Sequence, residues 1–417
     1  MTGPIGSPCA GITRGSDDRP DRPSGGGRKL TATAVTMGSM PTAATILPTR
    51  MQRQRLWGSA APDAVSVLGH LGAMQGQEFA YSLWALAQRV RADARPTEAD
   101  MLDSFDHGDI LRTHVLRPTW HLVRPGDVRS MLRLTAPRVR PALAGYDRQL
   151  GLDRVELDRS QAILASEVAG GRHRTRQQLA ESLTAAGVAA QGQRLAHLLS
   201  HAEFDEVLIS GAMAGKQQTY AAFDERVPPD NAPRGADGLF DAAAALAALA
   251  ARYLAARGPA TAKDFARWAT LTITQARTGL TAAGGRTEQH EGMTMYLPAD
   301  GGPEVSQWPR RPRVDLLQGY DELIMSYSES RSLVVPDGAA LPVLNQDHFL
   351  HAVLIDGVLA GHWRHRLTAR DAVVQVEPIR DWSAAERRAV ERAAGDYGRY
   401  LGRPASLTGL PAEGRPV

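Results

Sequence analysis

Residues 175–223, TRQQLAESLTAAGVAAQGQRLAHLLSHAEFDEVLISGAMAGKQQTYAAF, contain the pattern that decides the fold. Thr175 is a residue type preferred at a helix N-cap, and Leu179 and Leu183 lie four residues apart, so a helix is predicted over 175–188. Apolar residues at helical spacing predict a second helix over 192–207. The remainder predicts two short strands around a glycine-containing turn. Two helices followed by a two-stranded wing are typical of the winged-helix variant of the helix-turn-helix.

The same order recurs elsewhere in the chain, which indicates an internal repeat. A second copy begins at Thr261, 86 residues after Thr175, with a second helix at 273–284 and a wing at 286–298. A weaker copy precedes both, with helices expected at 62–73, 78–90 and 97–105 and a strand at 119–123. Three related units in tandem are a stronger indication than one such pattern in an alanine-rich chain.

The last hundred residues follow a different pattern. Residues 351–367 alternate apolar and polar side chains around Asp356-Gly357, which is a hairpin signal. A further strand is predicted at 371–379, and Ser383 caps an amphipathic helix. We therefore predict an α+β fold, mainly α, of tandem winged-helix units with a C-terminal β-rich subdomain and a closing helix. The predicted boundaries are 1–50 for a disordered leader, 51–150, 151–228 and 238–312 for the winged-helix units, and 313–417 for the subdomain.

The composition of the 417 residues is that of an ordinary soluble globular protein, with 43% hydrophobic and 22% charged residues and a net charge of +3. Lysine occurs only at Lys29, Lys216 and Lys263, so 45 of the 48 basic residues (48 − 3) are arginine. Arginine forks suit phosphates and stacked bases, although this mild basicity permits a nucleic-acid partner without requiring one. Cys9 is the only cysteine, which excludes disulfides and fits a reducing compartment. No apolar run reaches membrane-spanning length, and the leader lacks the apolar core of a signal peptide.

Gln75-Gly76-Gln77 interrupts two apolar helical segments within residues 68–90. Gly76 favours an extended or turned backbone. Residues two apart in an extended segment point to the same side, whereas on a helix they diverge, so both amides would face one ligand here. The alternative is that the two glutamines hydrogen-bond the backbone of a loop.

Three longer segments resemble the AlkZ/YcaQ family of winged-helix DNA glycosylases: RQRLWG with VSVLGHLGAMQGQEFAYSLWAL (53–58 and 65–86), ILRTHVLRPTWHLVRPGDVRSML (110–132) and LLQGYDELIMSYSESRSLV (316–334). The resemblance runs from about residue 50 to the C-terminus. It implies tandem winged-helix units around a concave DNA channel, with Gln75 and Gln77 as the catalytic pair. The sequence departs from the family where a usually hydrophobic residue is Gly76 and where the usual LLPxxD is LLQGYD (316–321).

The resemblance implies hydrolysis of the N-glycosidic bond of alkylated or bulky purines, including interstrand crosslinks, in DNA repair or antibiotic self-resistance. Amide side chains suit this chemistry, because a purine alkylated at N7 or N3 is already cationic and leaves without a general acid. The glutamines then need to place a water, with Gln77 orienting it and Gln75 assisting. Glu78 is a competing candidate for a general base, although a glutamate at a helix start more often compensates the helix dipole.

Further DNA-binding candidates lie in three segments. RPTWHLV (117–123) contributes Arg117, Thr119 and His121, of which His121 would meet the DNA backbone or the abasic sugar. The alternative for His121 is a half-buried histidine with its hydrogen bonds satisfied. The other candidates are Arg331 in SESR and the strand arginines Arg364 and Arg366, which grip phosphate or are simply solvated.

No metal and no cofactor are expected. His107 and His114, with Asp106 and Asp109, match no zinc-ligand spacing, and no cysteine assists them. Phosphate-binding glycine fingerprints and Ser-His-Asp arrangements are also not recognised.

Two functions of different classes remain. The favoured one is a cytoplasmic, nucleoid-associated, monomeric glycosylase acting on double-stranded DNA with alkylated purines, and not on membranes. The alternative is a non-catalytic winged-helix DNA-binding protein such as a transcriptional regulator. A regulator normally dimerises on a two-fold operator, and three dissimilar tandem units with a glutamine pair do not fit that expectation.

Overall fold

The folded region begins earlier than the sequence predicts. The computed structural model describes residues 43–58, 60–229, 232–299, 311–333, 351–368 and 370–409, so residues 1–42 of the predicted leader lie outside the described residues. Residues 43–50 belong to helix α1 (Ala43–Arg53), in which Ile46 and Arg50 are buried. The prediction of a disordered leader up to residue 50 was therefore wrong at its end. Arg50 is fixed by contacts distant in sequence, since it donates to Pro259 O at 2.9 Å and to Ser330 Oγ at 2.6 Å.

The first repeat contains the three predicted helices and the predicted strand near residues 119–123, together with two further strands. Asp63 and Thr97 accept hydrogen bonds as N-caps of its first and last helices, and Gly72, with φ of 79°, ends the first. Its elements are α2 (Ala64–Leu71), β1 (Ala73–Gln75), α3 (Phe79–Ala87), α4 (Glu98–His107), β2 (Leu111–His114) and β3 (Trp120–Val123).

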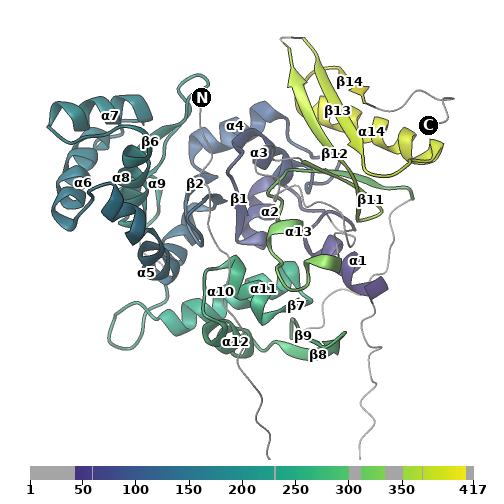
Figure 1. Ribbon diagram of the computed structural model, residues 1–417, viewed down its shortest axis with the longest axis horizontal. Coiled ribbons are helices and arrows are strands. Elements are labelled where there is room, and N and C mark those ends of the chain that lie inside the picture. The colour runs from purple at the N-terminus through teal and green to yellow at the C-terminus, as the bar shows by residue number, and fades with distance from the viewer. Residues whose placement is uncertain are drawn as a thin grey trace, which may run out of the picture. The chain divides into compact units, whose positions relative to one another are not determined.

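The second and third repeats are confirmed at the level of helices and hairpins (Figure 1). Thr175 and Thr261 both cap a helix through a capping box, as their sequence positions predict. The second repeat comprises α6 (Arg154–Val168), β4 (Arg174–Thr175), α7 (Arg176–Ala185), α8 (Gly192–Phe204), β5 (Leu208–Ser210), β6 (Thr219–Ala222) and α9 (Phe223–Arg226). The third comprises α10 (Ala242–Arg257), β7 (Ala260–Thr261), α11 (Ala262–Trp268), α12 (Ile273–Ala282), β8 (Arg286–His290) and β9 (Met293–Leu297).

Each repeat also has a short strand that the sequence did not predict. β1, β4 and β7 each pair antiparallel with the last strand of their own hairpin, giving sheet orders β1-β3-β2, β4-β6-β5 and β7-β9-β8. The identical strand order in three places supports the internal repeat. In the first repeat this extra strand carries the first glutamine of the motif.

The C-terminal region is built on one sheet of order β10-β11-β12-β13-β14. The predicted turn is confirmed, because Asp356 (φ 52°) and Gly357 (φ 86°) both take the left-handed conformation of a tight hairpin. Ser383 caps the closing helix as predicted. The elements are β10 (Val314–Leu317), α13 (Glu322–Met325), the 3-10 helix η1 (Arg331–Leu333), β11 (His351–Ile355), β12 (Val358–Leu367), β13 (Ala372–Pro378), α14 (Ala384–Tyr400) and β14 (Ala405–Thr408).

Hydrophobic packing crosses the predicted domain boundaries. One buried cluster joins Leu68 and Trp84 of the first repeat to Trp363 and Tyr397 of the C-terminal region. A second joins the β1-β3-β2 sheet to the third repeat and to α5 (Pro125–Gln149), a long helix that the sequence did not predict. The second repeat has a cluster of its own. The α+β fold is therefore confirmed, whereas the domain boundaries remain a prediction. The segment 73–78 lies where two shared clusters meet.

Candidate functional site

The short strand β1 positions Gln75 opposite His121. The two residues are Cα partners in the antiparallel pairing of β1 with β3. Gly76 follows in extended pairing, and its N–H donates to Trp120 O at 2.8 Å. Its φ is not in the left-handed range, but a Cβ there would lie 3.3 Å from Leu122 Cγ and from Leu122 N. Glycine therefore allows a close approach of the two strands rather than an unusual backbone angle.

Gln75 is 2% exposed and is held at three points. Its N–H donates to Glu322 Oε1 at 3.0 Å, and its carbonyl oxygen accepts from Gln318 Nε2 at 3.2 Å. Its side-chain oxygen accepts from Arg117 Nη2 at 2.8 Å. These bonds fix both the backbone and the amide plane of Gln75, and they come from segments far apart in sequence.

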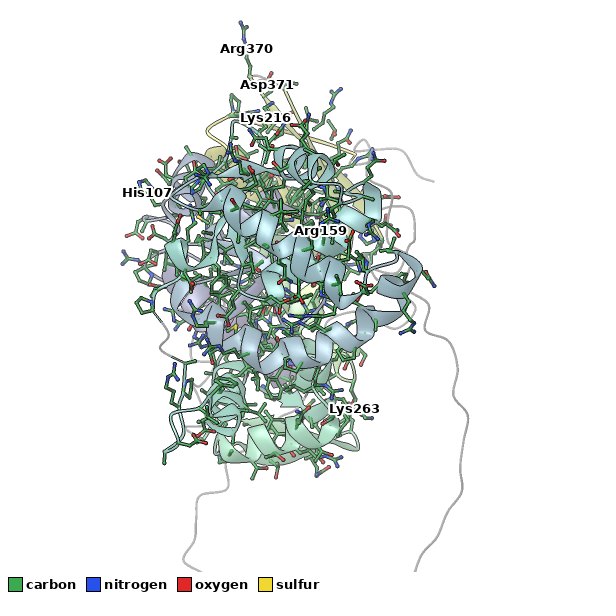
Figure 2. All side chains as sticks on the ribbon, turned by 90° about the vertical axis from the view of Figure 1, so that its left-hand side faces the viewer. His107, Arg159, Lys216, Lys263, Arg370 and Asp371 are labelled. Carbon is green, nitrogen blue, oxygen red and sulfur yellow. The ribbon has the colours of Figure 1, made fainter. Side chains whose placement is uncertain are left out.

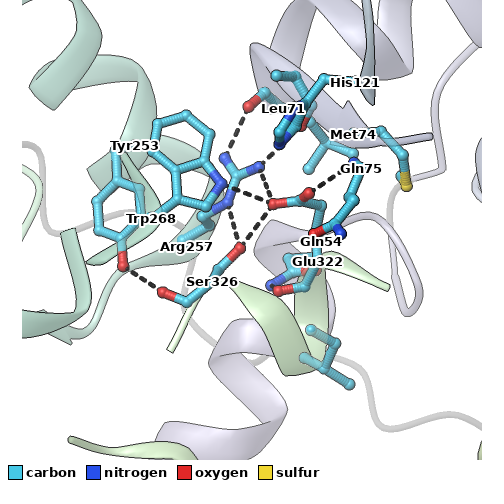
Figure 3. Close-up of polar contacts among 12 residues, drawn as sticks. Gln54, Leu71, Met74, Gln75, His121, Tyr253, Arg257, Trp268, Glu322 and Ser326 are labelled. Atoms are coloured by element: carbon cyan, nitrogen blue, oxygen red, sulfur yellow. Dashed lines mark hydrogen bonds and ion pairs between the residues drawn. The ribbon is translucent and has the colours of Figure 1, made fainter. Parts of the chain in front are cut away.

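Glu322 is the centre of a buried polar cluster (Figure 3). Its Oε2 accepts from Arg257 Nη2, from Trp268 Nε1 and from Ser326 Oγ, each at 2.8 Å. Burial by itself would raise the pKa of Glu322, but the charges of Arg257 and Arg117 and the hydrogen bond from Arg257 lower it to about 2. Glu322 is therefore ionised at neutral pH, as a buried carboxylate paired with arginine should be.

Arg117 connects Gln75 with His121 and the third repeat. Besides Gln75, its guanidinium contacts His121 Nε2 at 3.0 Å and donates to Trp268 O at 2.8 Å. Because arginine has no acceptor, Nε2 of His121 must be the unprotonated nitrogen, and Nδ1–H donates to Thr119 O at 2.9 Å. Burial lowers the pKa of Arg117 to about 10, so it stays charged. Burial and the charge of Arg117 lower the pKa of His121 to about 3, so it stays neutral.

His121 is closer to the alternative given from the sequence, a half-buried histidine with its hydrogen bonds satisfied, and is in fact fully buried. The ring is 0% exposed, and both nitrogens are bonded within the protein. It therefore offers no surface to the DNA backbone or to an abasic sugar, and its Nε2 accepts from Arg117 instead. The expected strand begins one residue later than predicted, at Trp120, and Leu122 and Val123 are buried as well.

Gln77 differs from Gln75 in being exposed. It lies in the bend between β1 and α3, and its carbonyl oxygen accepts from Arg112 Nη2 at 3.4 Å. The two glutamines therefore differ in burial, and the expectation that both amides face one ligand stays a prediction. One glutamine is fixed inside the protein, and the other stands at the surface two residues away.

Glu78 is the N-cap residue of α3, but its side chain makes no capping hydrogen bond. Its carboxylate lies 3.4 Å from His351 Nδ1, which already accepts from Gly319 N–H at 2.9 Å. Burial raises the pKa of Glu78 to about 7. A carboxyl group beside Gln77 whose pKa is raised toward neutrality has the properties of an acid–base group.

The other predicted DNA contacts are dispersed. Thr119 is half-buried, and its hydroxyl has no hydrogen-bond partner among the described residues. Arg331 donates to Tyr327 O at 2.9 Å, and burial and the charge of Arg267 lower its pKa. Arg364 and Arg366 are exposed on β12, and Arg364 donates to Gln375 Oε1 at 2.8 Å. The structure thus brings together Gln75, Arg117 and His121, while the two strand arginines belong to the C-terminal sheet.

Sequence reasoning missed the residues that fix the motif. Glu322, Arg257 and Gln318 carry the buried network, yet none was singled out as a site residue. Two signals were available: Arg257 ends an alanine-rich helix whose other residues are mostly apolar, and Gln318 and Glu322 lie in the LLQGYDE segment that carries part of the resemblance. Neither signal identifies the partner of either residue.

The two histidines considered as metal ligands, His107 and His114, do not converge. His107 contacts Asp103 O, and His114 contacts Glu203 at 2.5 Å. A different group among the described residues, Asp147 with His197 and His201, has geometry that could hold a metal ion. Its carboxylate lies 2.7 Å from His197 Nδ1 and 3.1 Å from His201 Nε2, which equally satisfies a hydrogen-bonded link between α5 and α8. The expected absence of a metal remains a prediction.

Comparisons with known proteins agree on one family. The family described as DNA glycosylase AlkZ-like matches residues 68–400. A Streptomyces sahachiroi protein named interstrand DNA cross-link repair glycosylase is 24% identical over 369 residues, covering 85% of this chain and 95% of that protein. The solved structure of Streptomyces sahachiroi DNA glycosylase AlkZ superposes with a TM-score of 0.65 at 21% identity, covering 89% of this chain and 100% of that one. The structural likeness shows a shared fold. None of the described helices is both long enough and apolar enough to cross a bilayer.

Proposed function

The chain belongs to the AlkZ-like family of DNA glycosylases, and from this premise we propose that it hydrolyses the N-glycosidic bond of cationic alkylated purines in double-stranded DNA. The observation that carries the proposal is the fixed geometry of the glutamine motif. Gln75 is bonded to Glu322, Gln318 and Arg117, and the exposed Gln77 follows two residues later. Gln75 is thereby held before substrate binds, which reduces the reorganisation needed in the transition state, whereas the exposed side chain of Gln77 stands where water and substrate can reach it.

The proposed reaction needs no general acid. In an N7-alkylguanine the imidazole ring is cationic, so the bond from C1′ to N9 breaks with its electron pair staying on N9, and a neutral base leaves. Gln77 orients the water that adds to C1′, because its side-chain amide oxygen accepts one hydrogen of that water. The proton that the water loses on addition is released to solvent. Gln75 assists by holding the loop in position. The ionised Glu322 lies behind Gln75, where it fixes the strand rather than the water.

The three strand–helix–helix–hairpin repeats are proposed to act as tandem winged-helix units lining a concave DNA channel, within the boundaries predicted above. Thr119, Arg331, Arg364 and Arg366 are proposed to contact DNA, with arginine–phosphate pairs providing salt-sensitive affinity. A lesion has no two-fold symmetry, which suits a monomer. The curated relative is named for repair of interstrand crosslinks, and we extend the proposed substrates to bulky adducts and crosslinks.

The test is product analysis on a duplex that contains one N7-methylguanine. We expect free 7-methylguanine, measured by mass spectrometry, together with a strand that stays intact until alkali cleaves the abasic site. Strand cleavage without alkali would exclude simple hydrolysis. Salt-sensitive binding without base release from methyl, bulky and crosslinked duplexes would identify a non-catalytic DNA-binding protein.

A further inference from the structure

Asp147, His197 and His201 meet between two packed helices, outside the machinery proposed above. Asp147 lies near the end of α5 (Pro125–Gln149), and the two histidines lie on α8 (Gly192–Phe204) of the second repeat. Histidines four residues apart share one face of a helix, which is the spacing that helical zinc sites use. The carboxylate of Asp147, 50 residues from His197 in sequence, lies against that face.

The donor atoms of this group lie close enough for one ion to bridge them. Asp147 Oδ1 lies 2.7 Å from His197 Nδ1, and Asp147 Oδ2 lies 3.1 Å from His201 Nε2. The three ligand atoms all lie within 4.8 Å of one another. Bonds of about 2.0–2.1 Å in a tetrahedral zinc site place neighbouring donor atoms about 3.3 Å apart. Small side-chain movements would therefore admit a Zn²⁺ ion.

The partners of the Asp147 carboxylate differ from those of the buried carboxylate in the site described above. Glu322 is paired with the fully buried Arg257. Asp147 is 8% exposed, and its two oxygens meet imidazole nitrogens instead. Because a buried carboxylate is either paired with a cation or coordinates a metal, Asp147 needs a source of positive charge.

A metal ion supplies that charge without protonation of a ring. Two imidazoles balance a carboxylate only when one of them is protonated. A divalent cation balances it while both rings stay neutral and each presents a nitrogen lone pair. His201 is buried, whereas His197 is half-buried and gives an ion a path from solvent.

The donor set also selects the kind of metal. Imidazole nitrogen suits Zn²⁺ and related divalent transition metals, whereas Mg²⁺ and Ca²⁺ prefer sites built from oxygen. Two histidines and one carboxylate leave the fourth tetrahedral position to water.

We propose that Asp147, His197 and His201 bind one Zn²⁺ ion, with a water molecule as the fourth ligand, and that the ion joins α8 to α5. This proposal replaces the expectation from sequence that the chain binds no metal. It rests on the contacts of these three residues and not on the proposed glycosylase reaction.

The role of the ion is structural. Two residues after His201, the buried Glu203 accepts from the His114 N–H at 2.8 Å. His114 ends β2, which belongs to the β1-β3-β2 sheet that carries Gln75. An ion that fixes α8 on α5 therefore stabilises the contact between the second repeat and this sheet.

The experiment uses the full chain, prepared without a polyhistidine tag and freed of metal by chelation and dialysis. Zn²⁺ affinity and stoichiometry are measured at neutral pH by competition with a chromophoric chelator, and stability by urea denaturation with and without Zn²⁺. Asp147→Asn and His197→Gln each remove one ligand and leave a side chain that can still form a hydrogen bond. The matched control is His107→Gln, at an exposed histidine (Figure 2).

We expect the wild type and the control to bind one Zn²⁺ per chain. Loss of an outer-shell partner already costs about 10–100-fold in metal affinity, so loss of a ligand should weaken Zn²⁺ binding by at least about 100-fold. Zn²⁺ should raise the urea midpoint of the wild type and of the control, because it binds the folded chain, and should leave the midpoints of both ligand variants unchanged.

Two results would overturn the proposal. If the wild type binds no Zn²⁺, Asp147 and the two histidines form only a hydrogen-bonded link between the helices. If His197→Gln binds Zn²⁺ as tightly as the wild type, the ion lies elsewhere in the chain. Far-UV circular dichroism shows whether the variants fold, and if Asp147→Asn does not, the variant at the half-buried His197 decides alone. Base release enters none of these measurements, so their outcome is independent of the proposed function.

Discussion

Replacing Glu322 with glutamine perturbs the point on which the motif depends. All four groups bonded to this carboxylate are donors: the Gln75 N–H, Arg257, Trp268 Nε1 and the Ser326 hydroxyl. Glutamine has the same shape but can place an oxygen at only one of the two positions. Its NH₂ group must then face a donor, either the Gln75 N–H or the group of three.

The cost can be worked out in two ways. Arg257 is fully buried, and breaking a buried ion pair by removing one partner costs about 3–5 kcal/mol. The same contacts lower the pKa of Glu322 from 4.5 to about 2, which corresponds to roughly 3 kcal/mol of stability. The two figures agree, so we expect Glu322→Gln to lower the free energy of unfolding by about 3–4 kcal/mol at pH 7.

The pH dependence has a definite sign. Because the folded-state pKa is depressed, the contribution of Glu322 is complete above pH 4.5 and is lost as the pH falls toward 2. Urea denaturation at pH 7 and pH 4 should therefore show a smaller difference between wild type and Glu322→Gln at the lower pH. Glu391→Gln, at an exposed glutamate of α14, is the control. A loss below about 0.5 kcal/mol at pH 7, the scale of ordinary surface substitutions, would refute this account of the cluster.

Three further predictions concern the loop itself. Arg117→Met leaves the Gln75 side-chain oxygen without its donor, so we expect a stability loss of about 1–3 kcal/mol. The single-turnover rate of base release should fall about 100-fold, and an unchanged rate would show that the orientation of Gln75 does not affect catalysis. Burial raises the pKa of Glu78 to about 7, so the folded state disfavours the ionised carboxylate. In urea titrations, the free energy of unfolding of the wild type relative to Glu78→Gln should therefore fall by about 1–2 kcal/mol between pH 5 and pH 8, and a difference independent of pH would contradict this. Gly76→Ala should lower the free energy of unfolding by less than about 1 kcal/mol, because Leu122 needs to move by only a few tenths of an ångström. The larger side chain of Gly76→Leu should lower it by about 1–3 kcal/mol in the same titrations, and equal losses would show that strand spacing is not the constraint.

Local signals predicted the secondary structure well. Thr175, Thr261 and Ser383 are caps whose side chains act within three residues, so the sequence pattern alone is sufficient to identify them. The strands β4 and β7 were missed because each has two residues and forms by pairing with a strand at least 34 residues away, as Ala260 does with Tyr296. Periodicity cannot detect a strand of that length.

The site was predicted in part. The motif at Gln75 and Gln77 was found from its extended spacing and from family resemblance, whereas Arg117 was named only as a candidate DNA contact. The contacts that hold the motif were not predicted, because Glu322 is 247 residues from Gln75 and meets it only in the folded chain. The different burial of the two glutamines likewise depends on long-range packing rather than on local pattern.

The most direct test of the central claim is the single-turnover rate of base release from an N7-methylguanine duplex at saturating enzyme, measured for wild type, Gln75→Ala, Gln77→Ala and the exposed control Gln193→Ala. Losing one polar group that stabilises the transition state costs about 100-fold or more in rate, so we predict that loss for both motif variants and wild-type activity for the control. DNA affinity should be nearly unchanged, since affinity comes mainly from phosphate contacts. Base release by Gln77→Ala at the wild-type rate would contradict the claim that this glutamine positions the water.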